Sequence, residues 1–289
     1  MLERVRSRIA DRSRIPLLDL APDPDHHRTV LTLAGPREEV AGAILALFDA
    51  AVEAIDLRGH RGVHPRMGAV DVVPIVPLGR TRMAACVDLA RELGAEIAGR
   101  FGIPVYLYER AAPGPERARL EEIRRGEFEG FPEKILRPEW RPDFGPARVH
   151  PTAGVVAVGA RGPLIAFNVD LESADIRIAR AIARSVRERD GGLPGLKAMG
   201  VFLEGRNRVQ VSMNLTDPRR TPIHEAFERV RAAAGRWGVE IASSEIVGLV
   251  PREAIRGVAV RALRLEGFGP DRVLENRLAA AGFAEAARD

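Results

Sequence analysis

Cysteine is almost absent from this sequence, which has a single one, Cys86, in 289 residues. One cysteine excludes an internal disulfide and is typical of proteins in a reducing compartment. Long apolar runs are absent too, since stretches such as 72–78 are far shorter than the roughly 18 residues that a membrane-spanning helix needs. Charged residues begin at Glu3, so the first residues show no apolar signal-peptide core. We therefore expect a cytoplasmic protein with no membrane segment.

Lysine is nearly as scarce, because Lys134 and Lys197 are the only lysines and arginine carries the rest of the positive charge. The formal net charge is +4. Arginine forms paired hydrogen bonds with carboxylates and phosphates, so this composition suits acidic ligands or nucleic acid. An arginine-for-lysine bias with abundant alanine and glycine also arises from codon composition alone, so the charge does not by itself assign a partner.

The remaining composition is that of a soluble protein with a buried core. Hydrophobic residues make up 46% of the chain and charged residues 29%, which is ordinary for a globular protein. A chain of 289 residues suits two small domains or one large one.

Apolar residues recur at helical or strand spacing along most of the chain. In the first half the spacing predicts helices at 2–14, 36–56 and 81–100 and strands at 17–20, 29–33, 70–76 and 105–108. A helix with an irregular arm is expected over 114–140 and a loop over 142–154. In the second half the spacing predicts strands at 164–169, 198–203, 209–215 and 239–242 and helices at 173–189, 221–237, 252–263 and 271–281.

The order of these elements predicts the fold class. The second half reads β-α-β-β-α-β, which is the ferredoxin-like order. The first half reads α-β-β-α-β, the same series without its opening strand. We therefore expect an α/β (α+β) protein of two ferredoxin-like subdomains, 1–161 and 162–289, with mixed sheets and helices on one face, the first subdomain lacking its opening strand.

Two histidines four residues apart, His60 and His64, stand out in the first half. On a helix this spacing could bind a metal. Gly62 and Pro65 make a helix unfavourable there, and no cysteine or third histidine is near in sequence, so no metal site is predicted. A histidine on a stiff loop suits proton transfer, because its pKa of about 6.5 lets it both take and give a proton. A structural histidine is the other interpretation.

Three further polar segments leave two interpretations each. The segment Asp23–Arg28 is either a solvated turn or the rim of a ligand site, and at most one of its adjacent histidines is expected to point inward. Residues 145–154 form either a ligand loop at the junction of the two halves or a linker. The alternating Gln210, Ser212 and Asn214 either face solvent or contact a ligand.

Several of these segments together resemble the glutamate formiminotransferase family. The segment His64–Ala69, followed by Val70–Pro74, is similar to the most recognisable motif of that family. Further similar segments follow the order of the family: 23–29, 104–108, 125–130, 142–146, 150–154, 165–169, 210–214 and 244–251. The resemblance covers almost the whole chain, and an ordered set of motifs is far more specific than any one of them.

The resemblance implies transfer of a formimino group from N-formimino-L-glutamate to tetrahydrofolate, a co-substrate, with no metal. It implies that His64 is the catalytic residue and that the chain forms a homodimer, with the product passing to a separate cyclodeaminase. The folate-binding stretch of the family maps onto Gly145, Pro146, Ala147, Arg148, Val149, His150, Pro151, Thr152, Ala153 and Gly154. Both substrates carry carboxylates, so Arg28, Arg66 and Arg161 are expected to anchor them.

Two departures from the family pattern accompany this resemblance. The family starts with a strand similar to Val-Pro-Asn-Phe-Ser-Glu-Gly, which agrees with the missing opening strand, and it often has asparagine where this chain has His27. The alternatives are formyl transfer from 5-formyl-tetrahydrofolate to glutamate and a folate-binding remnant with weak activity. An RNA-binding protein is disfavoured, because strand 209–215 lacks the aromatic residues on which RNA bases stack.

Overall fold

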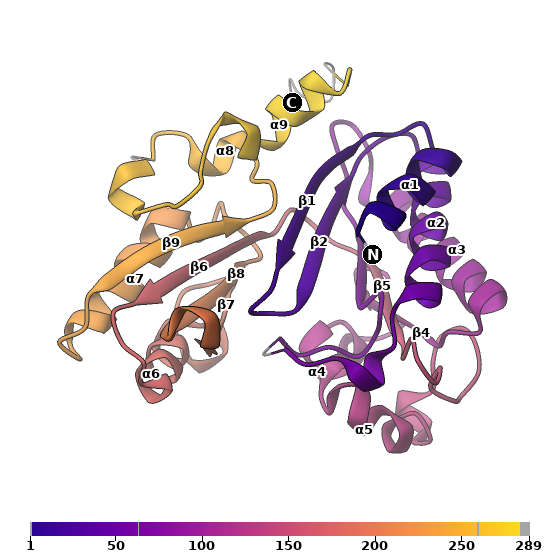
Figure 1. The fold of residues 1–289 in the computed structure, drawn as a ribbon, viewed down its shortest axis with the longest axis horizontal. Helices are drawn as coiled ribbons and strands as arrows, with labels where there is room; N and C mark the ends of the chain where they lie inside the picture. The colour runs from indigo at the N-terminus through magenta and orange to yellow at the C-terminus, as the bar shows by residue number, and fades with distance from the viewer. Residues whose placement is uncertain (1, 63, 259, 284–289) are drawn as a thin grey trace. The chain divides into compact units, whose positions relative to one another are not determined.

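The computed structural model describes residues 2–62, 64–258 and 260–283. The internal contacts divide the chain into two units (Figure 1). The first unit comprises residues 1–17 and 33–161, and the second comprises 18–32 and 162–289. The hairpin of β1 (Leu17–Asp23) and β2 (Arg28–Leu33) therefore belongs mainly to the second unit, although it lies early in the sequence.

The sheet of the first unit has three parallel strands in the order β3-β5-β4. The strands are β3 (Val72–Ile75), β4 (Val105–Glu109) and β5 (Val156–Ala160). The central strand β5 was not predicted from the sequence, and the two early strands do not join this sheet. The prediction of a mixed, ferredoxin-like sheet is therefore wrong for the described part of this unit, while the mixed α/β class is confirmed.

Helices cover both faces of this parallel sheet. On one face lie α2 (Arg37–Ala54) and α3 (Met83–Phe101), and their side chains form a core with Val105, Leu107 and Val158. On the other face α4 (Leu120–Arg124) and α5 (Glu127–Lys134) pack on Tyr106 and Tyr108. The prediction that helices cover only one face of the sheet is wrong for this unit, because a parallel sheet is stable when both of its faces are covered.

The helices of the first unit follow the sequence periodicity. In α3 the residues Leu89, Leu93 and Ile97 are buried at spacings of four, so one stripe faces the sheet. The helix ends at Gly102, which has φ +64°, the left-handed conformation that glycine adopts without strain. The first helix, α1 (Leu2–Arg12), packs on α2 (Figure 1).

The second unit has a four-stranded antiparallel sheet in the order β7-β8-β6-β9. Its strands are β6 (Ile165–Leu171), β7 (Leu196–Leu203), β8 (Arg208–Leu215) and β9 (Ile241–Val247). The helices α6 (Ile176–Val186) and α7 (Ile223–Gly235) share one core with the odd-numbered residues of β6. This order of strands and helices is ferredoxin-like, so the prediction is confirmed for this unit, with an antiparallel sheet rather than a mixed one.

The segment after β9 is more irregular than predicted. Instead of a helix over 252–263, the chain forms the short α8 (Arg252–Ile255), and α9 (Leu274–Ala280) follows. Through the backbone, Val250 N–H donates to Arg272 O at 2.9 Å, and Leu274 N–H donates to Val250 O at 2.9 Å. Among the helices of the described residues, none is long and apolar enough to cross a membrane.

Candidate active site

The predicted catalytic residue His64 lies on a loop of the first unit between the 3₁₀ helix η1 (Leu57–Gly59) and β3. His64 is half-buried. The residues that follow it turn sharply, and the turn is closed by Asp71, whose Oδ1 accepts hydrogen bonds from Met67 N at 2.8 Å and Gly68 N at 3.3 Å. Met67 is fully buried, so the chain is anchored a few residues after His64.

The guanidinium of Arg66 is held by side chains of the same unit. It donates to Glu129 through Nη1 at 2.7 Å and Nη2 at 2.6 Å, and its Nε donates to His60 Nδ1 at 3.1 Å. Glu127 lies 3.3 Å from the same guanidinium. The hydrogen bond from Arg66 is the main reason why the pKa of Glu129 is lowered. Arg66 therefore ties the loop to the start of α5, and its role as a substrate anchor stays a prediction.

The loop of His64 is joined to the predicted folate-binding stretch by backbone hydrogen bonds. Val155 N donates to Met67 O at 2.9 Å, and Ala69 N donates to Ala153 O at 3.0 Å. Between these bonds Gly68 and Gly154 pair as an antiparallel bridge. The structure thus brings together two segments that are far apart in the sequence.

Two glycines make this close approach possible. A Cβ at Gly68 would lie 2.0 Å from Val155 O, and a Cβ at Gly154 would lie 2.1 Å from Met67 O. Gly154 also has φ +72°, a left-handed conformation that other residues rarely adopt. Both positions therefore require glycine.

The other end of the stretch is anchored to β4. Val105 N donates to Phe144 O at 3.0 Å, and the carboxylate of Asp143 accepts from Leu107 N at 2.7 Å. Arg117 is buried and donates to the same carboxylate oxygen at 2.7 Å. The stretch is therefore fixed at both ends, with exposed residues from Gly145 to Arg148 between them.

His150 is the second histidine of this region, and its ring orientation is set by the backbone. Its Nδ1 accepts hydrogen bonds from Ala153 N at 3.0 Å and Thr152 N at 3.4 Å. A ring nitrogen that accepts a hydrogen bond carries no proton, so the proton of the neutral ring is on Nε2. Burial lowers the pKa of His150, which favours the same neutral form.

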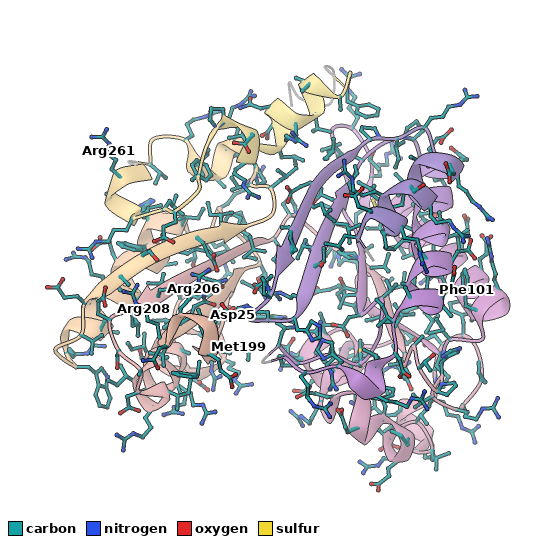
Figure 2. All side chains as sticks on the ribbon, in the orientation of Figure 1. Asp25, Phe101, Met199, Arg206, Arg208 and Arg261 are labelled. Atoms are coloured by element: carbon teal, nitrogen blue, oxygen red, sulfur yellow. The ribbon has the colours of Figure 1, made fainter. Side chains whose placement is uncertain are left out.

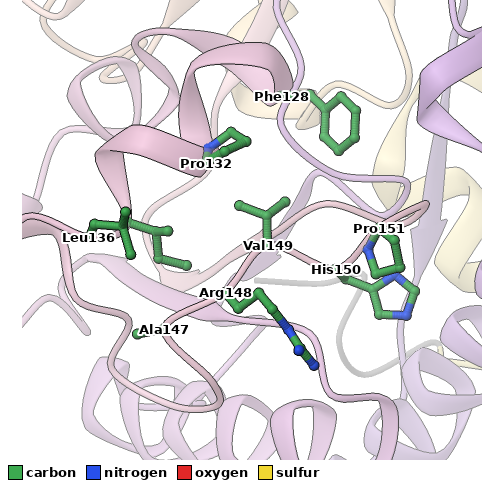
Figure 3. A pocket seen from close by; sticks show the side chains of 9 residues that line it. Phe128, Pro132, Leu136, Ala147, Arg148, Val149, His150 and Pro151 are labelled. Carbon is green, nitrogen blue, oxygen red and sulfur yellow. The ribbon is translucent and has the colours of Figure 1, made fainter.

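A hollow of about 260 Å³ lies between the stretch and α5 (Figure 3). Its walls are mostly apolar, and Arg148 and His150 are its polar side chains. The lining residues are Phe128, Pro132, Ile135, Leu136, Ala147, Arg148, Val149, His150 and Pro151. Leu136 is 70% exposed, which is unusual for so large an apolar side chain. The hollow has the composition of a small-molecule site, with apolar walls and a few polar groups.

The predicted anchor Arg28 lies in the second unit, at the start of β2. In the turn before it, His26 is buried and its Nδ1 lies 2.7 Å from Asp23 Oδ2, whereas His27 is exposed. The expectation that at most one of these histidines points inward is confirmed. Burial acts to raise the pKa of Asp23, but the hydrogen bonds from His26 outweigh it and lower that pKa to about 2.

Gln210, the first residue of the polar row of β8 in the second unit, joins a network of carboxylates, whereas Asn214 at the end of the row is exposed. Gln210 is fully buried, and its Nε2 donates to Asp170 at 2.8 Å and to Glu245 at 3.2 Å. Arg206 donates to Asp170 at 2.9 Å and lies 3.8 Å from Asp25, beside which Figure 2 shows it. Gln210 thus does not face solvent, which rejects one of its two interpretations.

Sequence reasoning missed several residues that shape this region, chiefly Asp71, Arg124, Glu127 and Glu129. Asp71 belongs to the motif that contains His64, so its place in the sequence was a usable signal. The glutamates gave none, because their contact with Arg66 depends on where α5 packs. Within the described residues, no three histidine, cysteine or acidic side chains are arranged to hold a metal ion.

Comparison with known proteins identifies the family. Residues 1–161 match the model of the formiminotransferase domain, N-terminal subdomain, and residues 166–264 match that of the formiminotransferase domain. A glutamate formimidoyltransferase of Thermoplasma acidophilum is 45% identical over 286 residues, covering 98% of this chain and 94% of the relative.

Two further relatives agree with these matches. A glutamate formimidoyltransferase of Streptococcus pyogenes serotype M1 is 43% identical over 265 residues, covering 91% of this chain and 89% of the relative. A formimidoyltransferase-cyclodeaminase of Dictyostelium discoideum is 39% identical over 286 residues, covering 96% of this chain and 53% of the relative. The chain belongs to the formiminotransferase family.

Proposed function

We propose that this chain transfers the formimino group of N-formimino-L-glutamate to tetrahydrofolate, giving 5-formimino-tetrahydrofolate and glutamate. The carrying observation is the backbone pairing of the His64 loop with the 145–154 stretch, at Gly68 and Gly154. It supports a single site in which a proton-transfer residue lies next to a binding segment. Relatives with the matching name, at 43% and 45% identity over most of their length, support the same assignment.

The reaction in this proposal is an addition followed by an elimination. N5 of tetrahydrofolate forms a bond to the formimino carbon, and the bond from that carbon to the glutamate nitrogen then breaks. One proton leaves N5 and one reaches the departing nitrogen, which leaves as the amine of glutamate. His64 performs both transfers in turn, an effect typically worth about 10²–10⁴-fold in rate. No electrons are exchanged with a cofactor, and the proposed step needs no metal.

The hollow beside α5 is the proposed position for the aromatic part of the folate. Phe128, Val149 and Leu136 provide apolar walls against which a flat ring can pack. His150 provides a hydrogen-bond donor at Nε2, and Arg148 is exposed at the rim, where it can pair with a carboxylate. Residues 145–154 as a whole are the proposed folate-binding stretch.

Two arginines are proposed as anchors for the substrate carboxylates. Arg66 contacts Glu127 and Glu129 of the same chain, so to bind a substrate carboxylate it would have to give up one of these two partners. Arg28 is the proposed second anchor. Residues 1–161 and 162–289 are proposed as the N-terminal and C-terminal subdomains of the formiminotransferase.

The setting of the enzyme is proposed from the family. We infer a cytoplasmic homodimer whose product is taken by a separate cyclodeaminase. Relatives in which the transferase name is joined to cyclodeaminase support the last point. Sedimentation of the purified chain would test the dimer directly.

The experiment that tests the function compares two one-carbon reactions on the purified chain. One mixture contains N-formimino-L-glutamate and tetrahydrofolate, and the other contains 5-formyl-tetrahydrofolate and glutamate. We expect the first mixture to give 5-formimino-tetrahydrofolate with many turnovers per enzyme. Turnover of the second mixture alone would assign formyl transfer instead, and turnover of neither would indicate a folate-binding remnant.

A further inference from the structure

We propose that Asp71 is a positioning residue of the reaction, whose carboxylate holds the backbone that carries His64 in the geometry needed for proton transfer. This inference rests on the proposed function, because it assigns to Asp71 an effect that acts through His64. Asp71 itself is not assigned any contact with substrate.

The first observation is the direction of its hydrogen bonds. Oδ1 of Asp71 accepts from the backbone N–H groups of Met67 at 2.8 Å and Gly68 at 3.3 Å. These groups follow His64 by only three and four residues. A carboxylate that accepts backbone N–H bonds makes them charge-assisted, which is about twice as strong as a neutral hydrogen bond. The turn after His64 is therefore closed by a strong, local contact.

The second observation is that the carboxylate is itself fixed. Its other oxygen, Oδ2, lies 2.6 Å from Nη2 of Arg124 at the end of α4. The two side chains are only 22% and 17% exposed, so water screens this pair weakly. The backbone oxygen of Asp71 also accepts from Ala157 N of the central strand β5, at 3.1 Å. Asp71 is thus tied to a helix and to the sheet, and it transmits that position to the loop.

The third observation concerns what else holds the loop. Arg66 ties it to Glu129, but that carboxylate is 65% exposed and the bond is open to solvent. On the sheet side the pairing of Gly68 with Gly154 fixes the chain beyond Met67. The less exposed side chain of Asp71 holds the turn that lies between His64 and the pairing of Gly68 with Gly154. Displacement of a catalytic group by about 1 Å can cost on the order of 100-fold in rate.

The test begins with three variants of this contact. Asp71→Ala removes both hydrogen bonds and the ion pair, Asp71→Asn keeps an acceptor at Oδ1, and Arg124→Met removes only the ion pair. We expect kcat to fall by about 10- to 100-fold in Asp71→Ala and by less in the other two, with KM for both substrates within about twofold. The matched control is Asp175→Ala, which removes a partly exposed carboxylate that accepts from Arg177 N at 2.9 Å in the second unit.

The decisive comparison repeats Asp71→Ala in a His64→Ala background. If Asp71 acts through His64, the loss of Asp71 has little further effect once His64 is absent. The double variant then has the same residual kcat as His64→Ala alone. Equal losses in both backgrounds would show a general structural role and overturn the proposal. A wild-type kcat in Asp71→Ala would overturn the proposal as well. If Asp71→Ala does not fold, a wild-type kcat in both single variants, Asp71→Asn and Arg124→Met, would overturn it in the same way.

The two hypotheses fail differently in this experiment. If His64→Ala keeps more than a tenth of the wild-type kcat, the proposed role of His64 fails and the inference about Asp71 fails with it. If His64→Ala is inactive while the Asp71 variants are unimpaired, only the inference about Asp71 is wrong.

Discussion

The glycine at position 154 offers a sharp test of how the two segments of the candidate site are joined. In Gly154→Ala the new Cβ would lie 2.1 Å from Met67 O and 3.0 Å from the side chain of Leu57. The alanine would also have to adopt φ +72°. The left-handed conformation costs about 1–2 kcal/mol, and forced overpacking costs about 1–3 kcal/mol. We therefore expect the free energy of unfolding to fall by about 2–5 kcal/mol.

A matched variant separates the two costs. Gly102→Ala places alanine at φ +64° in the same unit, but its Cβ would meet no atom within 4 Å. It carries only the conformational cost, about 1–2 kcal/mol. Urea unfolding of both variants measures the difference, which is the cost of pushing the 150–154 turn away from the His64 loop.

The same pair of variants predicts an effect on activity. Gly154→Ala shifts the backbone next to the His64 loop, so kcat should fall about tenfold or more, whereas Gly102→Ala should keep the wild-type kcat. If Gly154→Ala were as stable and as active as Gly102→Ala, the pairing of Gly68 with Gly154 would not be what organises the site.

Three further predictions concern single side chains. Lys134→Met should lower the free energy of unfolding by about 3 kcal/mol in urea titrations, because the buried Nζ donates to three backbone carbonyls at 2.6, 2.7 and 2.9 Å; full stability would contradict this. Asp23 has a lowered folded pKa of about 2 against an ordinary 3.8, so it contributes about 2 kcal/mol above pH 4 that is lost as the pH falls towards 2. Asp23→Asn should remove that part of the acid sensitivity, and an unchanged acid profile would refute it. Arg66→Lys should raise KM for at least one substrate about threefold or more, while Arg231→Lys at an exposed pair should not; unchanged KM values would remove Arg66 from binding.

The second unit was predictable from its sequence because its strands alternate cleanly. In β8 the residues Val209, Val211, Met213 and Leu215 are buried beneath α6 and α7, and this period of two is visible in the sequence. An antiparallel sheet with helices on one face preserves that pattern. The element order then leaves the ferredoxin-like arrangement as the natural solution.

The first unit was harder because its sheet is parallel and covered on both faces. Every residue of β5, Val156–Ala160, is buried, so the strand shows no alternation, and a short apolar run of this kind is ambiguous. The hairpin strands were predicted at nearly the right residues. Their sheet was not, because nothing local to 17–33 specifies which unit they join.

In the candidate site, the segments could be predicted from the sequence but the contacts between them could not. The His64 loop and the 145–154 stretch were singled out by their residue types, and the family resemblance, which compares short segments independently of each other, predicted their roles. Their pairing through Gly68 and Gly154 could not be predicted, because a glycine signals a close approach without naming its partner. The contacts of Arg66 with Glu127 and Glu129 likewise depend on packing that no local pattern encodes.

The proposed role of His64 is tested most directly by kcat of the His64→Ala variant in the transfer from N-formimino-L-glutamate to tetrahydrofolate. Tetrahydrofolate affinity and the free energy of unfolding are measured on the same preparation, so that a binding or folding defect is recognised. We predict a kcat lowered by about 10²–10⁴-fold with affinity and stability close to wild type. A variant that folds, binds tetrahydrofolate and keeps more than about a tenth of the wild-type kcat would contradict the assignment of His64 as the proton-transfer residue.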